Sequence, residues 1–237
     1  MTGAAPHMRP KGPAPELVIF DCDGVLVDSE PLAIAVLTAT LAELGLSVDD
    51  EMAYDRFLGR SFSTMTAILR KEFDLELAPG TVETMRSKLF ARFEAALSPV
   101  AGIGNVLAGL DMPFCVASSS QPERIALSLK LTALDTYFGS HVFSATMVEN
   151  GKPAPDLFLL AARQMGFSPE KCLVIEDSPA GILAAKAAGM KVFGFTGGGH
   201  AEPAGLDEKL AMLEPDYIFA DMQMLPDLLH SPQLFGE

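Results

Sequence analysis

A short apolar segment that ends in two aspartates constrains the fold of this chain most strongly. Leu17–Phe20 is rich in β-branched and aromatic residues, and Asp21, Asp23 and the turn residue Gly24 follow it. This pattern predicts a strand buried on both faces whose carboxyl end meets solvent at Asp21. Ligands bind at that edge of open α/β sheets, and two carboxylates so close can face one crevice. The pair repels unless a cation or shared proton neutralises it, although two solvated loop acids are an alternative interpretation.

The composition favours a soluble globular protein. Its 237 residues, 49% of them hydrophobic, suffice for one large domain or for a core that carries a smaller insert. No stretch has the pattern of a signal peptide or the length of a membrane span, so we expect a cytoplasmic protein without a membrane partner. Cys22, Cys115 and Cys172 each lie within or beside an apolar run, which is typical of buried thiols in a reducing compartment.

The net charge of -14 bears on possible partners. It argues against nucleic acid, whose phosphates are also negative. An anionic substrate would need a local positive centre, which a divalent cation and one or two lysines would supply. We expect a chain that is a monomer or a weak dimer.

The chain divides into three parts by pattern. Residues 1–15 hold four prolines and two glycines without periodicity and are predicted to form a disordered leader. Residues 31–98 are predicted to form an inserted all-helical domain, because their four helical patterns, at 31–44, 49–56, 64–73 and 81–97, include no strand candidate. The remainder, 16–30 and 99–237, is predicted to be a doubly wound α/β core with a parallel sheet. Its strand candidates are 17–20, 113–117, 142–144, 172–176, 191–195 and 217–220.

Three serines follow the second of these strand candidates. Ser118, Ser119 and Ser120 lie at its carboxyl end, where a hydroxyl and the following backbone amides can donate to a phosphate oxygen. We predict this role for Ser118. Ser120 and Glu123 have the spacing of a capping box, which is the prediction for Ser120 considered alone.

Lys152 and the pair Glu176 and Asp177 are further candidates. Two prolines restrain Lys152 ahead of a helix, which suits a fixed positive charge for an anion, although a lone lysine in a turn is usually solvated. Glu176 and Asp177 end a strand candidate, ahead of a helix that Ser178 can cap. Acids at such a position often serve only the helix dipole, but they also offer the hard oxygen ligands that Mg²⁺ requires.

Two more polar residues lie in loops. Arg60 is a candidate for a second anionic contact, and an exposed arginine without a role is the alternative. The glycine run 197–199, which precedes His200, lacks the lysine of a nucleotide phosphate-binding loop. We predict a flexible turn there and a surface position for His200.

The chain resembles a known family. Asp21-x-Asp23-Gly24-Val25-Leu26-x-Asp28-Ser29 is similar to the first motif of the haloacid dehalogenase-like (HAD) phosphohydrolases, in the subgroup of β-phosphoglucomutase and phosphoglycolate phosphatase-like enzymes. Three further matches follow in the family's order, at Ser118, at Lys152 and at Glu176 with Asp177. Together they cover the chain from about residue 16 to 221.

The resemblance implies a fold and a mechanism. The core would be Rossmann-like with the helical segment as a cap, and Asp21 would attack phosphorus to form an aspartyl-phosphate while Asp23 acts as general acid and base. Mg²⁺ would be held by Asp21, the backbone carbonyl of Asp23 and Asp177, with Glu176 a direct or water-mediated partner. The substrate would be a small phosphorylated compound. Ser118 and Lys152 would contact its phosphoryl group, and further substrate contacts would come from Gly24, Ser119, Ser120 and Arg60.

The motifs leave alternatives in function. A phosphoryl-transfer isomerase of the β-phosphoglucomutase type shares every core motif, whereas a catalytically silent binding protein would not need all the reactive residues. An acid at position 23 disfavours dehalogenation and phosphonate cleavage. Ala33 occupies the position of a histidine in the mutases, and Leu58 and Phe62 replace an expected lysine and arginine. The sequence therefore predicts a phosphatase.

Overall fold

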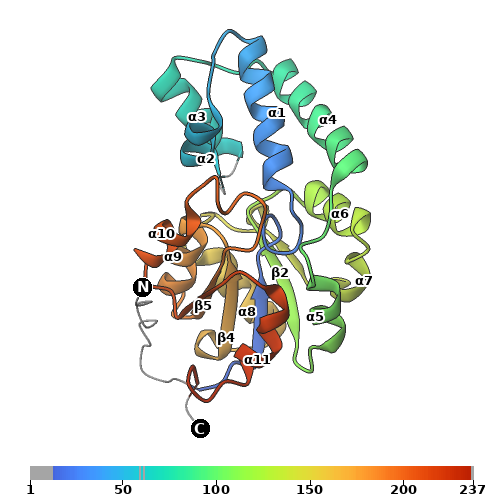
Figure 1. Cartoon of the computed structure of the whole chain (residues 1–237), viewed down its shortest axis with the longest axis vertical. Helices are drawn as coiled ribbons and strands as arrows, with labels where there is room; N and C mark the ends of the chain where they lie inside the picture. The colour runs from blue at the N-terminus through green and yellow to red at the C-terminus, as the bar shows by residue number, and fades with distance from the viewer. Residues whose placement is uncertain (1–12, 59, 61, 236–237) are drawn as a thin grey trace, which may run out of the picture.

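The computed structural model describes residues 13–58, 60 and 62–235. The predicted leader lies almost entirely outside these residues. The centre of the described chain is a six-stranded, all-parallel sheet in the order β3-β2-β1-β4-β5-β6 (Figure 1). The strands are β1 (Leu17–Phe20), β2 (Phe114–Ser118), β3 (Val142–Ser144), β4 (Cys172–Glu176), β5 (Lys191–Phe195) and β6 (Tyr217–Phe219). The six strands predicted from the sequence are confirmed.

β1 lies in the middle of the sheet. Ile19 pairs with Cys115 of β2 on one side and with Val174 of β4 on the other, and all four residues of β1 are buried. The order reverses on either side of β1, as in a doubly wound, Rossmann-like sheet. The predicted fold class is therefore confirmed, and the switch point of the sheet lies at the carboxyl end of β1, directly before Asp21.

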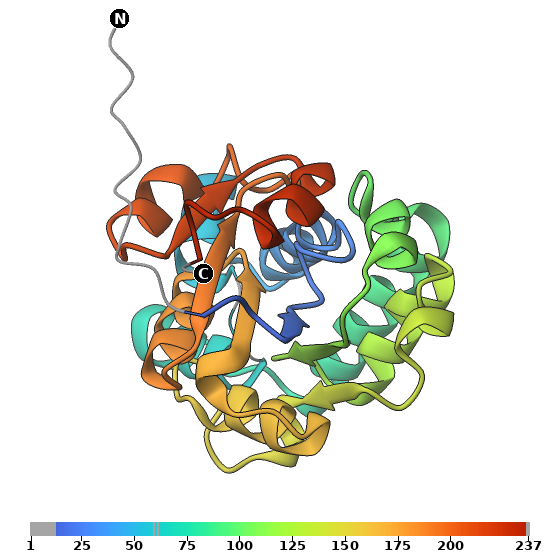
Figure 2. The ribbon, with the colours of Figure 1, turned by 90° about the horizontal axis from the view of Figure 1, so that it is seen from below.

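Helices cover both faces of the sheet, as Figure 2 shows from below. Val18 and Phe20 point to one face, in a cluster with residues of α5 (Ile103–Gly109), α6 (Pro122–Leu131), α7 (Asp135–Phe138) and α11 (Leu225–Leu229). Leu17 and Ile19 point to the other, with residues of α8 (Asp156–Met165), α9 (Pro179–Ala187) and α10 (Leu206–Ala211). This alternation is the period-two pattern of a strand buried on both faces. The three cysteines are buried free thiols, as predicted.

Four helices lie apart from the sheet, at the top of Figure 1. They are α1 (Glu30–Glu43), α2 (Asp50–Phe57), α3 (Phe62–Phe73) and α4 (Pro79–Ala96), and the described residues from 30 to 98 contain no named strand. α1 packs on α2 and α4, and the apolar cluster between these helices also includes Ala201, Ala204 and Leu206 of the core. The two connections to the core lie side by side, since the amide of Asp28 donates to the carbonyl of Ser98 at 3.0 Å.

Local signals set some of the helix ends. Gly45, with φ +85°, follows the end of α1, and the Ser178 hydroxyl accepts from the amide of Gly181 at 3.0 Å to cap α9. The capping box predicted for Ser120 is wrong: the N-cap of α6 is Gln121, without a side-chain cap. The Ser120 hydroxyl instead contacts Asp23, a tertiary contact that replaces the local one.

The remaining elements are short. They are the 3₁₀ turns η1 (Ala145–Met147), η2 (Pro169–Lys171) and η3 (Met222–Met224). In the part of the chain that the structure describes, no helix combines the length and the apolar character needed to cross a membrane.

Candidate active site

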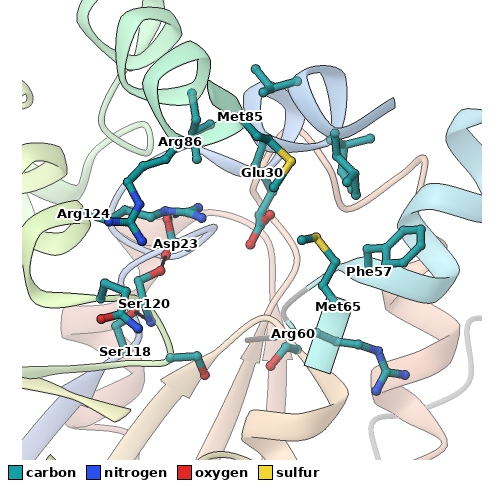
Figure 3. Close-up of a pocket in the computed structure, with 18 of the residues that line it drawn as sticks. Asp23, Glu30, Phe57, Arg60, Met65, Met85, Arg86, Ser118, Ser120 and Arg124 are labelled. Carbon is teal, nitrogen blue, oxygen red and sulfur yellow. Dashed lines mark hydrogen bonds and ion pairs between the residues drawn. The ribbon is translucent and has the colours of Figure 1, made fainter. Parts of the chain in front are cut away.

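A pocket of about 700 Å³ lies at the carboxyl edge of the sheet, beneath α1 and α4. The strand ends of the core supply its polar floor, and the four outlying helices supply much of its apolar wall (Figure 3). The structure brings most of the predicted site residues together here: Asp21, Asp23, Arg60, Ser118, Ser119, Ser120, Lys152, Glu176 and Asp177 all line the pocket.

Asp21 is the first acid of the first motif, and it is buried. Its carboxylate accepts from Lys152 Nζ at 2.6 Å, and its amide donates to the carbonyl of Ile175 in β4 at 3.0 Å. Burial holds the pKa of Asp21 well above its usual value, and the neighbouring acids Glu176 and Asp177 act in the same direction while Lys152 opposes them. The single charge of Lys152 therefore does not offset the effects of burial and of the neighbouring acids on the pKa of Asp21.

Lys152 is the fixed cation that its flanking prolines predicted. Its side chain is 2% exposed, and Nζ donates to Asp21 and Glu176, each at 2.6 Å, and to the carbonyl of Ala117 at 2.9 Å. It also lies 4.8 Å from the centre of the Phe158 ring. Burial alone would lower the pKa of Lys152, but the two carboxylates outweigh it and raise the pKa, so the ammonium stays charged.

Asp23 has three side-chain donors. They are Ser29 and Ser120, both at 2.5 Å, and Arg124 at 2.7 Å. Burial acts to raise the pKa of Asp23, but the Arg124 charge and the two hydroxyl hydrogen bonds outweigh it and hold the pKa below its usual value. Ser29 and Arg124 were missed as functional candidates. Arg124 gave one signal, since a cation in the first turn of a helix opposes the helix dipole and needs an anionic partner.

Glu176 is fully engaged by protein donors. Oε1 accepts from Lys152 at 2.6 Å, and Oε2 accepts from both the amide and the hydroxyl of Ser178 at 2.9 Å. A side chain at Gly181 would overlap this carboxylate, so the glycine lets α9 approach it. The geometry places Glu176 as the residue that orients Lys152.

His200 corrects a prediction. It was expected at the surface, but it is fully buried, and Nε2 lies 2.8 Å from Oδ2 of Asp177. Neither ring nitrogen has a well-aligned hydrogen bond among the described residues, and the contact is an ion pair when the imidazole is protonated. Burial acts to lower the pKa of His200, but Asp177 outweighs it and raises the pKa. The position of His200 in the sequence could have predicted this contact, because His200 follows β5 at the same edge of the sheet as Asp177.

Two loops meet beside this pair. The amide of Gly199 donates to Asp28 at 2.9 Å, which joins the loop after β5 to the first motif. Gly24 has φ +79°, and a side chain there would overlap Oδ2 of Asp177. The glycine therefore permits the close approach of the two acidic loops, which is what places Asp177 beside the first motif.

The remaining predicted substrate contacts are Ser118, Ser119 and Arg60. The Ser118 hydroxyl is 1% exposed and accepts from the amide of Ser120 at 3.1 Å, which shapes the serine turn at the pocket floor. Ser119 lines the pocket beside it. Arg60 is exposed, and in Figure 3 its guanidinium points away from Asp23. Its contact with a second anion stays a prediction.

The acidic floor fits one divalent cation. Four carboxylates, of Asp21, Asp23, Glu176 and Asp177, are contacted by Lys152 and Arg124 and, at Asp177, by the imidazole of His200. The described chain holds no cluster of three or more acidic, histidine or cysteine side chains arranged as metal ligands. Two carboxylates, a backbone carbonyl and oxygens from outside the protein are the kind of shell that Mg²⁺ accepts.

The fold and the pocket define an α/β protein with a polar candidate site at the carboxyl edge of a parallel sheet. The comparison with known families agrees with the resemblance of the motifs. The chain belongs to the haloacid dehalogenase-like hydrolases, whose family model matches residues 15–189.

Named relatives give the class of reaction. The chain is 32% identical to 6-phosphogluconate phosphatase of Escherichia coli (strain K12) over 189 residues, 79% of this chain and 86% of that protein. It is 30% identical to phosphoglycolate phosphatase of Rhodospirillum rubrum over 236 residues, 94% of each. Among solved structures, a HAD family hydrolase of Deinococcus radiodurans R1 with bound phosphate and sodium is 32% identical, with a TM-score of 0.73 over 94% of this chain and 98% of that one. The protein is a phosphoric monoester hydrolase.

Proposed function

We propose that this enzyme hydrolyses a small phosphorylated metabolite through an aspartyl-phosphate on Asp21, with Mg²⁺ as cofactor. The observation that carries the proposal is the contact of Asp21 with Lys152 at 2.6 Å in a pocket at the end of the central strand. A lysine held there offsets charge on both the nucleophile and a phosphate. The phosphate bound to the Deinococcus radiodurans relative supports the same ligand chemistry.

The reaction would take two steps. A carboxylate oxygen of Asp21 bonds to phosphorus as the bond to the ester oxygen breaks, and Asp23 gives its proton to the departing alkoxide. Water then attacks the phosphorus of the aspartyl-phosphate and loses its proton to Asp23, which releases phosphate and restores Asp21. Ser118 and Lys152 would hold the phosphoryl oxygens in both steps.

Mg²⁺ would be held by Asp21, Asp177 and the backbone carbonyl of Asp23. The raised pKa of Asp21 supports this, because a nucleophile must be ionised and a nearby cation favours the ionised form. When bound, Mg²⁺ would neutralise the negative charge that gathers on the phosphoryl oxygens. Both oxygens of Glu176 have protein donors, so we assign it the orientation of Lys152 and contact with the ion only through water.

We also propose that residues 31–98 act as a cap that closes the pocket and selects the substrate. Ala33, Ile34 and Leu37 of α1 and Met85 of α4 line the pocket together with the core residues. The alanine, where the resemblance implies a histidine in the mutases, supports hydrolysis over isomerisation. We expect no interconversion of glucose 1-phosphate and glucose 6-phosphate, even with a bisphosphate primer.

The test is phosphate release from a panel of esters with Mg²⁺. The panel would hold sugar phosphates, phosphoglycolate, nucleotides and an aryl phosphate, with Asp21→Asn as the variant. We expect kcat to fall at least about a thousandfold, because the amide keeps the shape and loses the nucleophilic charge. Asp111→Asn, an exposed acid outside the pocket, is the matched control. Turnover retained by a folded Asp21→Asn protein would exclude this mechanism.

A further inference from the structure

Glu30 is a buried acid to which the mechanism above gives no role. It is the first residue of α1, it is 8% exposed, and it lines the pocket. Among the described residues its carboxylate makes no hydrogen bond or ion pair. Glu30 is therefore an acid that is nine-tenths buried and has no hydrogen-bond or ion-pair partner in the part of the chain that the structure describes.

This burial opposes ordinary energetics. Moving a carboxylate out of water without a partner is costly, and burial together with the nearby Asp23 raises the pKa of Glu30 to about 7. The dipole of α1 favours an acid in the first turn, but an exposed acid would gain the same benefit. The helix therefore explains the residue type and leaves its burial unexplained.

The direction of the side chain suggests what its partner is. Figure 3 shows Glu30 extending from α1 towards the centre of the pocket, with Asp23 and Arg124 on one side and Met65 on the other. The other residues that α1 contributes to the pocket are apolar: Ala33, Ile34, Val36 and Leu37. Glu30 is thus the one polar group that this wall offers, and it faces the part of the pocket next to Asp23.

We infer that Glu30 accepts hydrogen bonds from hydroxyl groups next to the esterified carbon, so that the enzyme selects phosphate esters of polyols. This inference rests on the proposed function, in which Asp23 meets the ester oxygen; a group close to Asp23 must then meet the neighbouring carbons. Polyol here includes sugars, sugar alcohols and sugar acids whose carboxylate lies far from the ester.

Two other partners fit the pocket less well. An ammonium group would also donate to Glu30, but Arg86 and Arg124 lie together on the adjoining side in Figure 3 and would repel it. A carboxylate one carbon from the ester, as in phosphoglycolate, would be repelled by Glu30 itself. Hydroxyls are the donors that suffer neither repulsion.

The experiment measures binding in the Asp21→Asn protein, so that turnover does not consume the ligands. The probes are glycerol 1-phosphate, propyl phosphate and phosphoglycolate, which differ in the groups beside the ester, and each Kd is measured by calorimetry. We expect glycerol 1-phosphate to bind at least about tenfold more tightly than propyl phosphate, because hydrogen bonds to a charged group contribute about 1.5–3 kcal/mol. Phosphoglycolate should bind most weakly.

The double variant Asp21→Asn, Glu30→Met tests the residue. Methionine keeps the length of the side chain and removes the acceptors, so the preference for glycerol 1-phosphate should disappear and phosphoglycolate should bind more tightly. Asp21→Asn with Glu123→Gln, an exposed acid at the pocket edge, should keep the original order. Calorimetric unfolding of each variant shows whether it is folded.

The outcomes separate this inference from the proposed function. If Asp21→Asn binds propyl and glycerol phosphates equally, or if Glu30→Met leaves their ratio unchanged, Glu30 does not select hydroxyls. If the binding order holds while Asp21→Asn retains turnover, the pocket preference stands and the nucleophile assignment fails.

Discussion

Asp23 is held as an anion although the proposed chemistry asks it to give up a proton. Arg124, Ser29 and Ser120 all stabilise the charged form, and Arg124 lies against the ring of Phe93 in α4 at 5.3 Å. This contact joins the acid to one of the outlying helices. Substrate binding between α4 and the core would therefore act on the same arginine that holds Asp23 charged.

Arg124→Met tests the strength of this arrangement. We expect the free energy of unfolding to fall by about 3 kcal/mol at pH 7, because the variant leaves a buried carboxylate without its cation. The pKa of Asp23 is lowered in the folded protein, so the stability it contributes is present above the unfolded value and is lost as pH falls through the folded one. The loss in the variant should shrink towards pH 3. Urea unfolding at both pH values measures it, with Lys130→Met, exposed on the same helix, as control.

Glu30 should give the opposite pH dependence. Its pKa is about 7 in the folded protein against an ordinary 4.5, so between these values the folded state binds the proton more tightly and stability falls as pH rises. Glu30→Gln removes this effect. We expect the variant to gain about 2 kcal/mol relative to the wild type between pH 5 and pH 8, measured by urea unfolding in chelator. Parallel pH profiles for the two proteins would contradict the raised pKa.

At the scale of single residues, the sequence predicted acids and cations that lie at strand ends. Asp21, Lys152 and Asp177 were found because an apolar strand, or a pair of prolines, marks their position. Arg124 was missed because it binds Asp23, from which it is 101 residues distant in the chain. Such contacts depend on how helices pack, and the period of a local pattern does not contain that information.

Among the elements, the two glycine turns that follow β1 and α1 invite a direct comparison. Gly24 and Gly45 have nearly the same φ, +79° and +85°, but a side chain at Gly24 would overlap Asp177 whereas nothing lies within 4 Å at Gly45. Gly45→Ala should cost about 1 kcal/mol, from backbone strain alone. Gly24→Ala should cost more than twice as much and weaken Mg²⁺ binding, because Asp177 must move. Urea unfolding measures the stability of both variants, and metal titration measures their Mg²⁺ binding. An equal loss of stability in the two variants would show that the loops at Gly24 and Asp177 move apart without strain.

Element prediction succeeded where a pattern was long or strongly apolar. The six strands and the helices α1 to α4 were identified, and their ends differ by a residue or two from those predicted. Helices such as α7 and α11 were not recognised, because four or five residues complete too little of a turn pattern to show a period. The loop at 196–200 was read as a flexible turn, since its contacts with Asp28 and Asp177 come from distant segments.

The whole molecule is strongly acidic, and the pocket concentrates that charge. We expect Mg²⁺ to raise the melting temperature, because the ion would bind the folded state alone; at a hundred times Kd the gain is about 2.7 kcal/mol. Asp177→Ala should remove most of this shift, while Asp111→Asn should keep it. Differential scanning calorimetry with Mg²⁺ and with chelator gives the answer, and equal shifts in both variants would place the ion elsewhere.

The position of β1 in the middle of the sheet also fixes when the site can exist. Asp21 leaves the ribosome before the residues that it meets in the site, because Lys152 lies 131 residues later in the chain, and Asp177 and His200 follow. Until β2 and β4 are made, both edges of β1 lack partners and its apolar faces lack cover. A nascent chain thus carries Asp21, the proposed nucleophile, before the lysine beside it has been made, and the candidate site is complete only after Asp177 has been translated.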